Sequence, residues 1–263
     1  MKIQRIITWS KLMALPLLLV ACTESTELDN IEQTSEEVYP ELDFSCESPS
    51  RAVVSSFEPG AKIGVFVTDK GTTNGYGGNA SNMNITYTLN GDSYWEAGYN
   101  TALTNSEANV YGYYPYQSNV STGMAKLENG VDFLYTPVPS VISRNNPMAE
   151  IELNHAMSLL KFNFDASLGN ITRISVRSLP ASADYNVFTG KVIASSGSTS
   201  VDLTMNSPEI AEGFLAIPGY KIDVKVSSDK GSFVWKPGTV TESGKKYNIS
   251  VSYTHLRAHE TCA

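Results

Sequence analysis

Glu150 and Glu152 are the residues of this sequence whose spacing first suggests catalytic chemistry. They are two positions apart, so on a β-strand both side chains lie on one face at a spacing of about 7 Å. Two carboxylates at about that distance can serve as the acid and the base of a glycosidase. They alternate with Ile151 and Leu153, however, and these apolar side chains would form the buried face of such a strand. We therefore predict that both carboxylates point into solvent and that the pair is not catalytic.

Cys22 is a residue whose surroundings predict a covalent modification. Basic residues precede an apolar run over residues 12–21, and this ten-residue run is shorter than the roughly 20 residues that span a membrane. We therefore expect residues 1–21 to be a removable signal peptide. Residues 19–22 (Leu-Val-Ala-Cys) resemble the lipobox of bacterial lipoproteins, where the thiol receives a diacylglyceryl group before cleavage. The expectation is a lipid on Cys22 that anchors the chain to a membrane; the alternative is an ordinary signal peptide followed by a chance cysteine.

Most of the remaining residues that could bind a metal or act in catalysis lie at the other end of the chain. Residues 251–261 resemble one translated reading frame of a sequencing adapter, so we set residues 251–263 apart as an artefactual tail. The remaining inventory holds one histidine, His155, and, besides Cys22, one cysteine, Cys46. These counts exclude histidine-dependent triads, zinc sites with several Cys or His ligands, and redox pairs. We predict no enzyme activity, no metal and no cofactor, and a structural role for His155.

The charge of the chain is concentrated near its start. The sequence has 19 basic and 27 acidic residues, and nine of the acids but no base lie in residues 22–50. Residues 22–39 show no core pattern, which predicts a flexible acidic tether. They also resemble the surface-export signal of Bacteroidetes lipoproteins, with a plain solvated linker as the alternative. The remainder is nearly neutral, which argues against nucleic acid as a partner.

From residue 41 onward the apolar residues recur with a period of two, which is typical of β-strands. Turn dipeptides separate many short runs, and the pattern allows at most one short helical turn, at residues 208–211. Many short strands at such spacing predict an all-β sandwich or barrel. Prolines and asparagines interrupt the pattern near 137–149, so we place two β-sandwich domains at 40–148 and 149–250.

Tyr111, Tyr113 and Tyr116 form an aromatic segment close in sequence to Tyr94 and Tyr99. Such rings could stack on sugars and so contact a ligand on a host or bacterial surface. Aromatic residues of strands more often pack the core, because the core buries their large apolar area. Packing of the sandwich and its rim is therefore the role that we favour for this group, and ligand contact is the alternative.

Five parts of the sequence together make it similar to a known family. None is a catalytic signature, and their order along the chain is more specific than any one of them. By these parts the chain resembles the fimbrillin-like lipoproteins of Bacteroidales, the shaft and tip subunits of lipoprotein-derived pili. The resemblance covers most of residues 40–250 and implies two transthyretin-like β-sandwich domains in tandem. The parts are 42–44 with 50–52, 60–66, 111–116, 151–162 and 244–249.

The resemblance also implies a mode of assembly. In this family an Arg-specific protease cuts after an arginine that follows the first strand, and a strand of a neighbouring subunit then fills the vacated place. Arg51 matches that arginine by position, so the cut would fall between Arg51 and Ala52. The displaced strand would carry the alternating face of Leu42, Phe44 and Cys46. The alternative is that Arg51 is an exposed loop charge in a protein that is never processed.

These inferences give two functional hypotheses. The first is a cell-surface fimbrial subunit or fimbrillin-like adhesin that joins other pilus subunits by strand exchange. The alternative is a surface-anchored glycan-binding lipoprotein that does not polymerise. Both place the protein at the outer membrane, held by the lipid on Cys22, at the cell surface or in a fimbrium.

Overall fold

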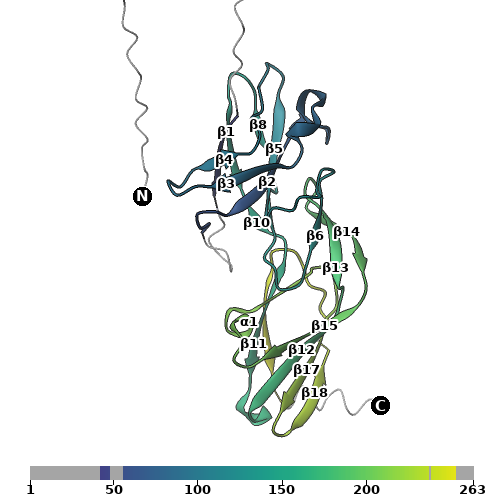
Figure 1. Cartoon of the computed structure of the whole chain (residues 1–263). Helices are drawn as coiled ribbons and strands as arrows, with labels where there is room; N and C mark the ends of the chain where they lie inside the picture. Colours follow the sequence, from purple (N-terminus) through teal and green to yellow (C-terminus); the bar gives the residue numbers. More distant parts are fainter. Residues whose placement is uncertain (1–41, 48–55, 237, 253–263) are drawn as a thin grey trace, which may run out of the picture. The chain divides into compact units, whose positions relative to one another are not determined.

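The protein divides into two compact units, Met1–Glu37 and Val38–Ala263. The computed structural model describes residues 42–47, 56–236 and 238–252, all of which belong to the second unit (Figure 1). The regular secondary structure of these residues is almost entirely β-strand, as the alternating pattern predicts. Apart from three short 3-10 turns, the described ranges hold one helix, α1 (Pro208–Glu212), at the predicted short turn. In the same ranges no helix is long and apolar enough to cross a membrane.

A seven-stranded sheet is the centre of the N-terminal part. Its strands β2 and β5 pair antiparallel, with Val65 opposite Gly112 and Val67 opposite Val110. Branched and aromatic side chains are frequent in these strands because they pack well on a pleated surface. The strand order is β10-β7-β5-β2-β3-β4, with β8 paired to β5. The strands are β2 (Lys62–Asp69), β3 (Ile85–Leu89), β4 (Trp95–Ala97), β5 (Ala108–Tyr114), β7 (Leu134–Tyr135), β8 (Ser140–Ile142) and β10 (Asn154–His155).

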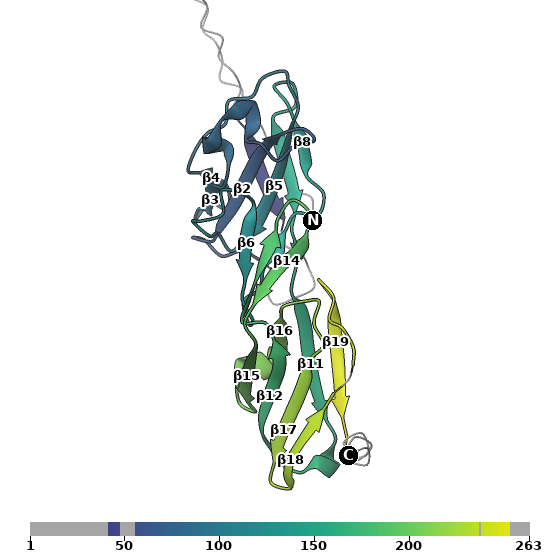
Figure 2. The same ribbon diagram turned by 90° about the vertical axis from the view of Figure 1, so that its right-hand side faces the viewer.

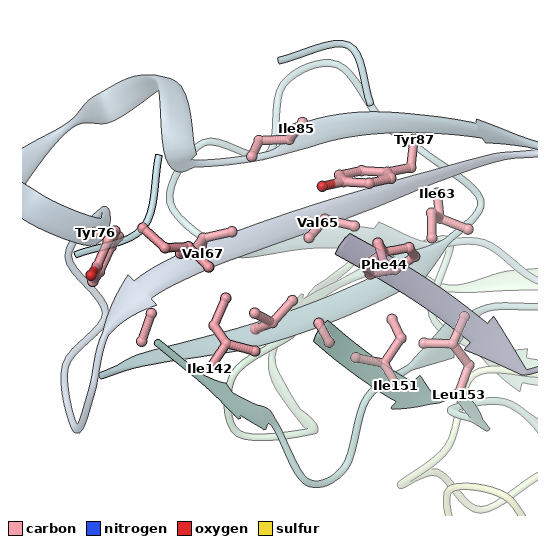
Figure 3. Close-up of a cluster of buried hydrophobic side chains, with 14 of the residues drawn as sticks. Phe44, Ile63, Val65, Val67, Tyr76, Ile85, Tyr87, Ile142, Ile151 and Leu153 are labelled. Atoms are coloured by element: carbon pink, nitrogen blue, oxygen red, sulfur yellow. The ribbon is translucent and has the colours of Figure 1, made fainter. Parts of the chain in front are cut away.

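A separate two-stranded sheet packs over one face of this sheet. It consists of β1 (Asp43–Glu47) and β9 (Met148–Glu152), which run parallel although they are about a hundred residues apart in the sequence. Phe44 of β1 and Ile151 of β9 join Val65 and Tyr87 of the larger sheet in one buried cluster (Figure 3). The first strand of the described chain is therefore part of the N-terminal core.

The central strands β2 and β5 are buried on both faces. The alternation of Val110, Gly112 and Tyr114 predicts one apolar face for β5, but the structure also buries Tyr113 and half-buries Tyr111. These two side chains point into a second cluster on the other face, where the rings of Tyr113 and Phe66 stack at 5.8 Å between centroids. A sheet between two cores has no polar face, so simple alternation underestimates its burial.

A three-stranded sheet supplies the other wall of this second cluster. It contains β6 (Met124–Leu127), β13 (Ser182–Asn186) and β14 (Lys191–Ser196), in the order β14-β13-β6. Strands from both halves of the sequence thus pair with one another. The predicted domain boundary between residues 148 and 149 stays a prediction. Strand β9 pairs with β1, and β10 pairs with β7. Residues up to His155 therefore belong with the N-terminal strands.

The C-terminal part consists of two sheets around a third buried cluster, which includes Leu160, Val176 and Val224. One sheet has the order β16-β11-β19, with β11 and β19 parallel and side by side (Figure 2), and the other has the order β15-β12-β17-β18. Val251 pairs with Phe164 and is buried, so the last strand runs one residue into the segment that we set apart as a tail. The strands are β11 (Ser158–Phe164), β12 (Ile171–Leu179), β15 (Thr199–Thr204), β16 (Phe214–Ala216), β17 (Asp223–Ser228), β18 (Gly231–Trp235) and β19 (Lys246–Val251).

Candidate functional site

The place occupied by β1 is the candidate functional site. Backbone groups hold this strand from two directions. On one side it pairs with β9 in a parallel register that sets Phe44 opposite Ala149 and Cys46 opposite Ile151. On the other side the Leu42 N–H donates a hydrogen bond to the Thr101 carbonyl oxygen at 3.2 Å. We call the residues that β1 covers, namely Tyr87, Thr101, Ala149 and Ile151, the β1 seat.

The apolar face of β1 is the one that the sequence predicts. Phe44 is only 8% exposed, and its ring centroid lies 4.4 Å from that of Tyr87 at an interplanar angle of 39°. Leu42 and Cys46 are partly buried against the same cluster, whereas Ser45 between them is exposed. Full burial of a phenylalanine side chain contributes roughly 1.5–3 kcal/mol. The inward orientation of Leu42, Phe44 and Cys46 is therefore confirmed, and their displacement stays a prediction.

Glu150 and Glu152 lie on the β9 side of the seat. Exposed and buried residues alternate along the strand, with Ala149 and Ile151 inside and both glutamates in solvent, as predicted. The Glu150 N–H donates to Ser140 Oγ at 3.3 Å, which ties β9 to β8. Among the described residues, no group of three or more His, Cys, Asp or Glu side chains comes together as a metal site would require.

Tyr113 packs the core, which is the role favoured for this aromatic group, and the alternative of ligand contact has to be corrected for this residue. Its side chain is completely buried, and its hydroxyl donates to Asn84 Oδ1 at 2.7 Å and to the Gln117 carbonyl oxygen at 2.9 Å. Burial raises the pKa of Tyr113 far above that of a free tyrosine, because the interior disfavours the charged phenolate. The physical reason for the correction is that β5 lies between two cores.

Tyr111 and Tyr116 are half-buried, and the structure does not bring them together with Tyr113 on one platform. Tyr111 packs edge-on against Phe188 with ring centroids 5.0 Å apart. Tyr116 lines a surface hollow of about 680 Å³ with Lys126 and Val131 among its walls. The more exposed tyrosines are Tyr94 at 46% and Tyr99 at 40%.

His155 has a partner that the sequence did not reveal. Its Nδ1 lies 2.8 Å from Asp132 Oδ1, and the two side chains are 12% and 6% exposed. The pairing of β10 with β7 brings His155 beside Leu134, two residues after Asp132. A buried polar pair of this kind supports the predicted structural role, because it gives His155 Nδ1 and Asp132 Oδ1 a partner away from water. The other ring nitrogen, Nε2, is buried without a partner among the described residues. The 23-residue separation explains why no local motif signals the pair.

Several predicted residues lie outside the described ranges. These are the lipidation site Cys22 and the processing site formed by Arg51 and Ala52, together with the signal segment 1–21 and the tether 22–39. The predictions that concern them stay predictions.

The arrangement of the described strands is similar to that of solved structures from Bacteroides. A candidate cell adhesion protein of Bacteroides uniformis is 18% identical with a TM-score of 0.60, and the match covers 82% of this chain and 95% of that one. A candidate cell adhesion protein of Bacteroides ovatus is 20% identical with a TM-score of 0.61, covering 82% and 92%. At these identities the likeness concerns the fold.

The family is shown by the sequence itself. No curated protein matches the chain. Residues 50–261, most of the chain, match the fimbrillin-like family, and the match includes β2–β19 and the turn regions between them. It begins just after β1, at the segment that contains Arg51. The chain belongs to the fimbrillin-like family.

Proposed function

We propose that this protein is a cell-surface fimbrial subunit or fimbrillin-like adhesin whose first strand is a removable part of its core. The observation that carries the proposal is the position of Phe44, which fills the core although β1 is a short strand held along β9 and at Thr101. Membership of the fimbrillin-like family and the fold of the two Bacteroides cell adhesion candidates support it.

Removal of β1 would create an acceptor for another strand. The inner side of the β1 seat, Tyr87 with Ala149 and Ile151, would lose its apolar cover. The Thr101 carbonyl and the edge of β9 would lose their backbone partners at the same time. Unpaired edge groups beside an uncovered apolar face favour addition of a strand from a second chain. Partner subunits of the same pilus are the occupants that this proposal implies.

The described arginines support a selective cut at Arg51. Arg173 lies in β12 with hydrogen-bonded strands on both sides, and Arg177 lies in the same strand opposite Asp223. The Arg144 N–H donates to the Thr104 carbonyl oxygen at 2.7 Å. A protease binds its substrate as an extended, unpaired segment, so backbone that is already paired is protected. Arg51 is the arginine that follows β1, in a stretch interrupted by Pro49.

Cleavage after Arg51 would also release the anchor. Cys22, the acidic tether and β1 all precede Arg51 in the chain. We propose that the lipid holds the precursor at the outer membrane and is lost together with β1 when a subunit is processed. A chain that is not cut would stay anchored as an adhesin.

Treatment of the full lipidated chain with an Arg-specific protease tests this proposal. We expect one cut, after Arg51, followed by polymers detectable by electron microscopy and size-exclusion chromatography. An Arg51→Gln chain should stay intact and monomeric, and an Arg144→Gln chain should behave like the parent. An intact, monomeric parent chain under these conditions would contradict the processed-subunit proposal.

Exposed aromatic residues favour glycan binding as a second candidate function. Tyr94 and Tyr99 are 46% and 40% exposed, and the Tyr99 hydroxyl accepts a hydrogen bond from Asn79 Nδ2 at 2.8 Å. A ring held in this way offers a face on which a sugar can stack. A glycan array with the full chain and with a Tyr94→Ala, Tyr99→Ala double variant tests this function. Signals that the double variant retains would exclude these tyrosines as the platform.

A further inference from the structure

The outer side of the β1 seat carries two acidic residues along β9, which we call the acidic rim. Glu150 and Glu152 of β9 are exposed there, on the side opposite the buried Ala149 and Ile151. On β4, which also contacts β1, Trp95 and Ala97 face the core beneath the seat, so Glu96 between them points to the opposite face of the large sheet and is not part of this rim. Arg144 precedes β9 and lies at the Met148 end of the rim. From Glu150 onward the charged side chains of β9 beside β1 are therefore negative.

The resident strand does not balance this charge. The parallel register places Ser45 opposite Glu150 and Glu47 opposite Glu152. Ser45 is exposed like its partner and carries no charge. Residues at opposed positions on neighbouring strands interact, and opposite charges favour the pair while like charges weaken it. The sequence of β1, Asp-Phe-Ser-Cys-Glu, contains no base, so this strand fits the seat through its apolar residues and offers no opposite charge to Glu150 or Glu152.

We infer that the seat selects its incoming strand by charge as well as by shape. The occupant that fits is an extended segment of a second subunit that runs parallel to β9. It carries apolar residues at the positions that Phe44 and Cys46 now hold, and Lys or Arg at those opposite Glu150 and Glu152. This inference rests on the proposed strand exchange and specifies the chemistry of the partner. Charge selection would also favour replacement of β1 over its return, because a basic donor strand gains ion pairs that β1 lacks.

A set of single and double charge substitutions in the full, uncut chain tests whether the acidic rim interacts with the strand beside it, independently of processing. Ser45→Lys places a base opposite Glu150, so amide hydrogen exchange of residues 42–47 should slow by about two- to fivefold. Combining it with Glu150→Lys restores like charges, and exchange should return to at least the parent rate. Glu128→Lys, at an exposed site of the β6 end, is the control for the overall change of charge. Equal effects of Glu150→Lys and Glu128→Lys in the Ser45→Lys chain would overturn the inference.

Competition between two peptides then tests donor choice in the chain cut after Arg51. The first peptide has the sequence of residues 41–47, and the second carries Ser45→Lys and Glu47→Lys. We expect the basic peptide to bind about tenfold more tightly, measured by fluorescence anisotropy, and the ratio to shrink at about 0.5 M salt. Equal binding of both peptides would overturn charge selection and leave strand exchange standing. Binding of neither would contradict the proposed function itself.

Discussion

The ring of Phe44 in β1 lies 4.4 Å, centroid to centroid, from the ring of Tyr87 in β3. This contact joins the first described strand to β3, which lies between β2 and the edge strand β4 of the seven-stranded sheet. Phe44 is 8% exposed and Tyr87 is 2% exposed, so neither ring could be left uncovered without loss of stability. A strand that carries such a contact is a structural element of the folded chain, and its replacement requires another strand with an equivalent side chain.

Truncation of the Phe44 side chain measures how much β1 contributes to the core. Phe44→Ala should lower the free energy of unfolding by about 3–4 kcal/mol, because it removes a buried ring and leaves a cavity beside Tyr87. Ser45→Ala changes an exposed residue of the same strand and should shift it by less than about 0.5 kcal/mol. Urea denaturation followed by tryptophan fluorescence gives both values. Similar values for the two variants would mean that β1 is not part of the cooperative core.

A substitution at Gly112 tests whether the packing of β5 against β9 holds β9 in place. A Cβ at this position would lie 2.3 Å from Ile151 Cδ1, so Gly112→Ala should push Ile151 away from the seat. We expect destabilisation of about 1–3 kcal/mol and faster amide exchange in β1 and β9. Gly91→Ala is the matched control, since a Cβ there meets nothing within 4 Å. Unchanged exchange in β9 of the Gly112→Ala chain would show that β5 does not support this strand.

The pair formed by Asp132 and His155 should be energetically coupled. A double-mutant cycle with Asp132→Asn and His155→Gln should give a coupling of about 1.5–3 kcal/mol, as expected for a buried hydrogen bond that involves a charged group. The cycle is needed because each single substitution also changes other contacts of its residue. Additive effects of the two substitutions would indicate that the 2.8 Å contact does not contribute to stability.

Two buried tyrosines predict a loss of stability at alkaline pH. Burial raises the pKa values of Tyr113 and Tyr185 above the ordinary value of 10.0. In the unfolded chain both hydroxyls ionise near pH 10, so above that pH the unfolded state binds fewer protons than the folded state. Their stabilising effect is therefore complete below about pH 10 and is lost progressively as the pH rises toward the folded-state pKa values.

The measurement is the free energy of unfolding between pH 8 and pH 11.5, by urea titration. Tyr113→Phe and Tyr185→Phe should each flatten the decline by up to about 1.4 kcal/mol per pH unit above pH 10. Ser45→Ala removes no ionisable group and should leave the slope unchanged. A parent chain with constant stability across this range would contradict the assigned burial.

The sequence is sufficient to predict which face of a strand each side chain occupies, because this feature repeats along the strand. Alternation alone predicted that Phe44 faces inward and that Glu150 and Glu152 face solvent, because side chains of a strand point to opposite faces in turn. It did not predict that β1 pairs with β9 or that Asp132 meets His155. Such partners are far apart in the sequence, and periodicity carries no information about which strands become neighbours.

Tyr113 shows a different limit of sequence patterns. The sequence favours packing for the aromatic segment but does not show what covers it, and here the aromatic face of β5 packs in a second core with β6 and β13. Only the three-dimensional path of the chain reveals that cover. The predictions for Cys22, Arg51 and Ala52 rest on the sequence and on the family to which the chain belongs.

Replacement of the resident strand tests the central claim most directly. The chain is cut after Arg51 and incubated with an isotopically labelled peptide of residues 41–47, and native mass spectrometry follows which strand is bound. We predict one-for-one replacement of the resident fragment in the cut chain. An Arg51→Gln chain should take up no peptide, because its tethered β1 competes at a high effective concentration. A cut chain that keeps its original fragment and binds no labelled peptide would contradict the account.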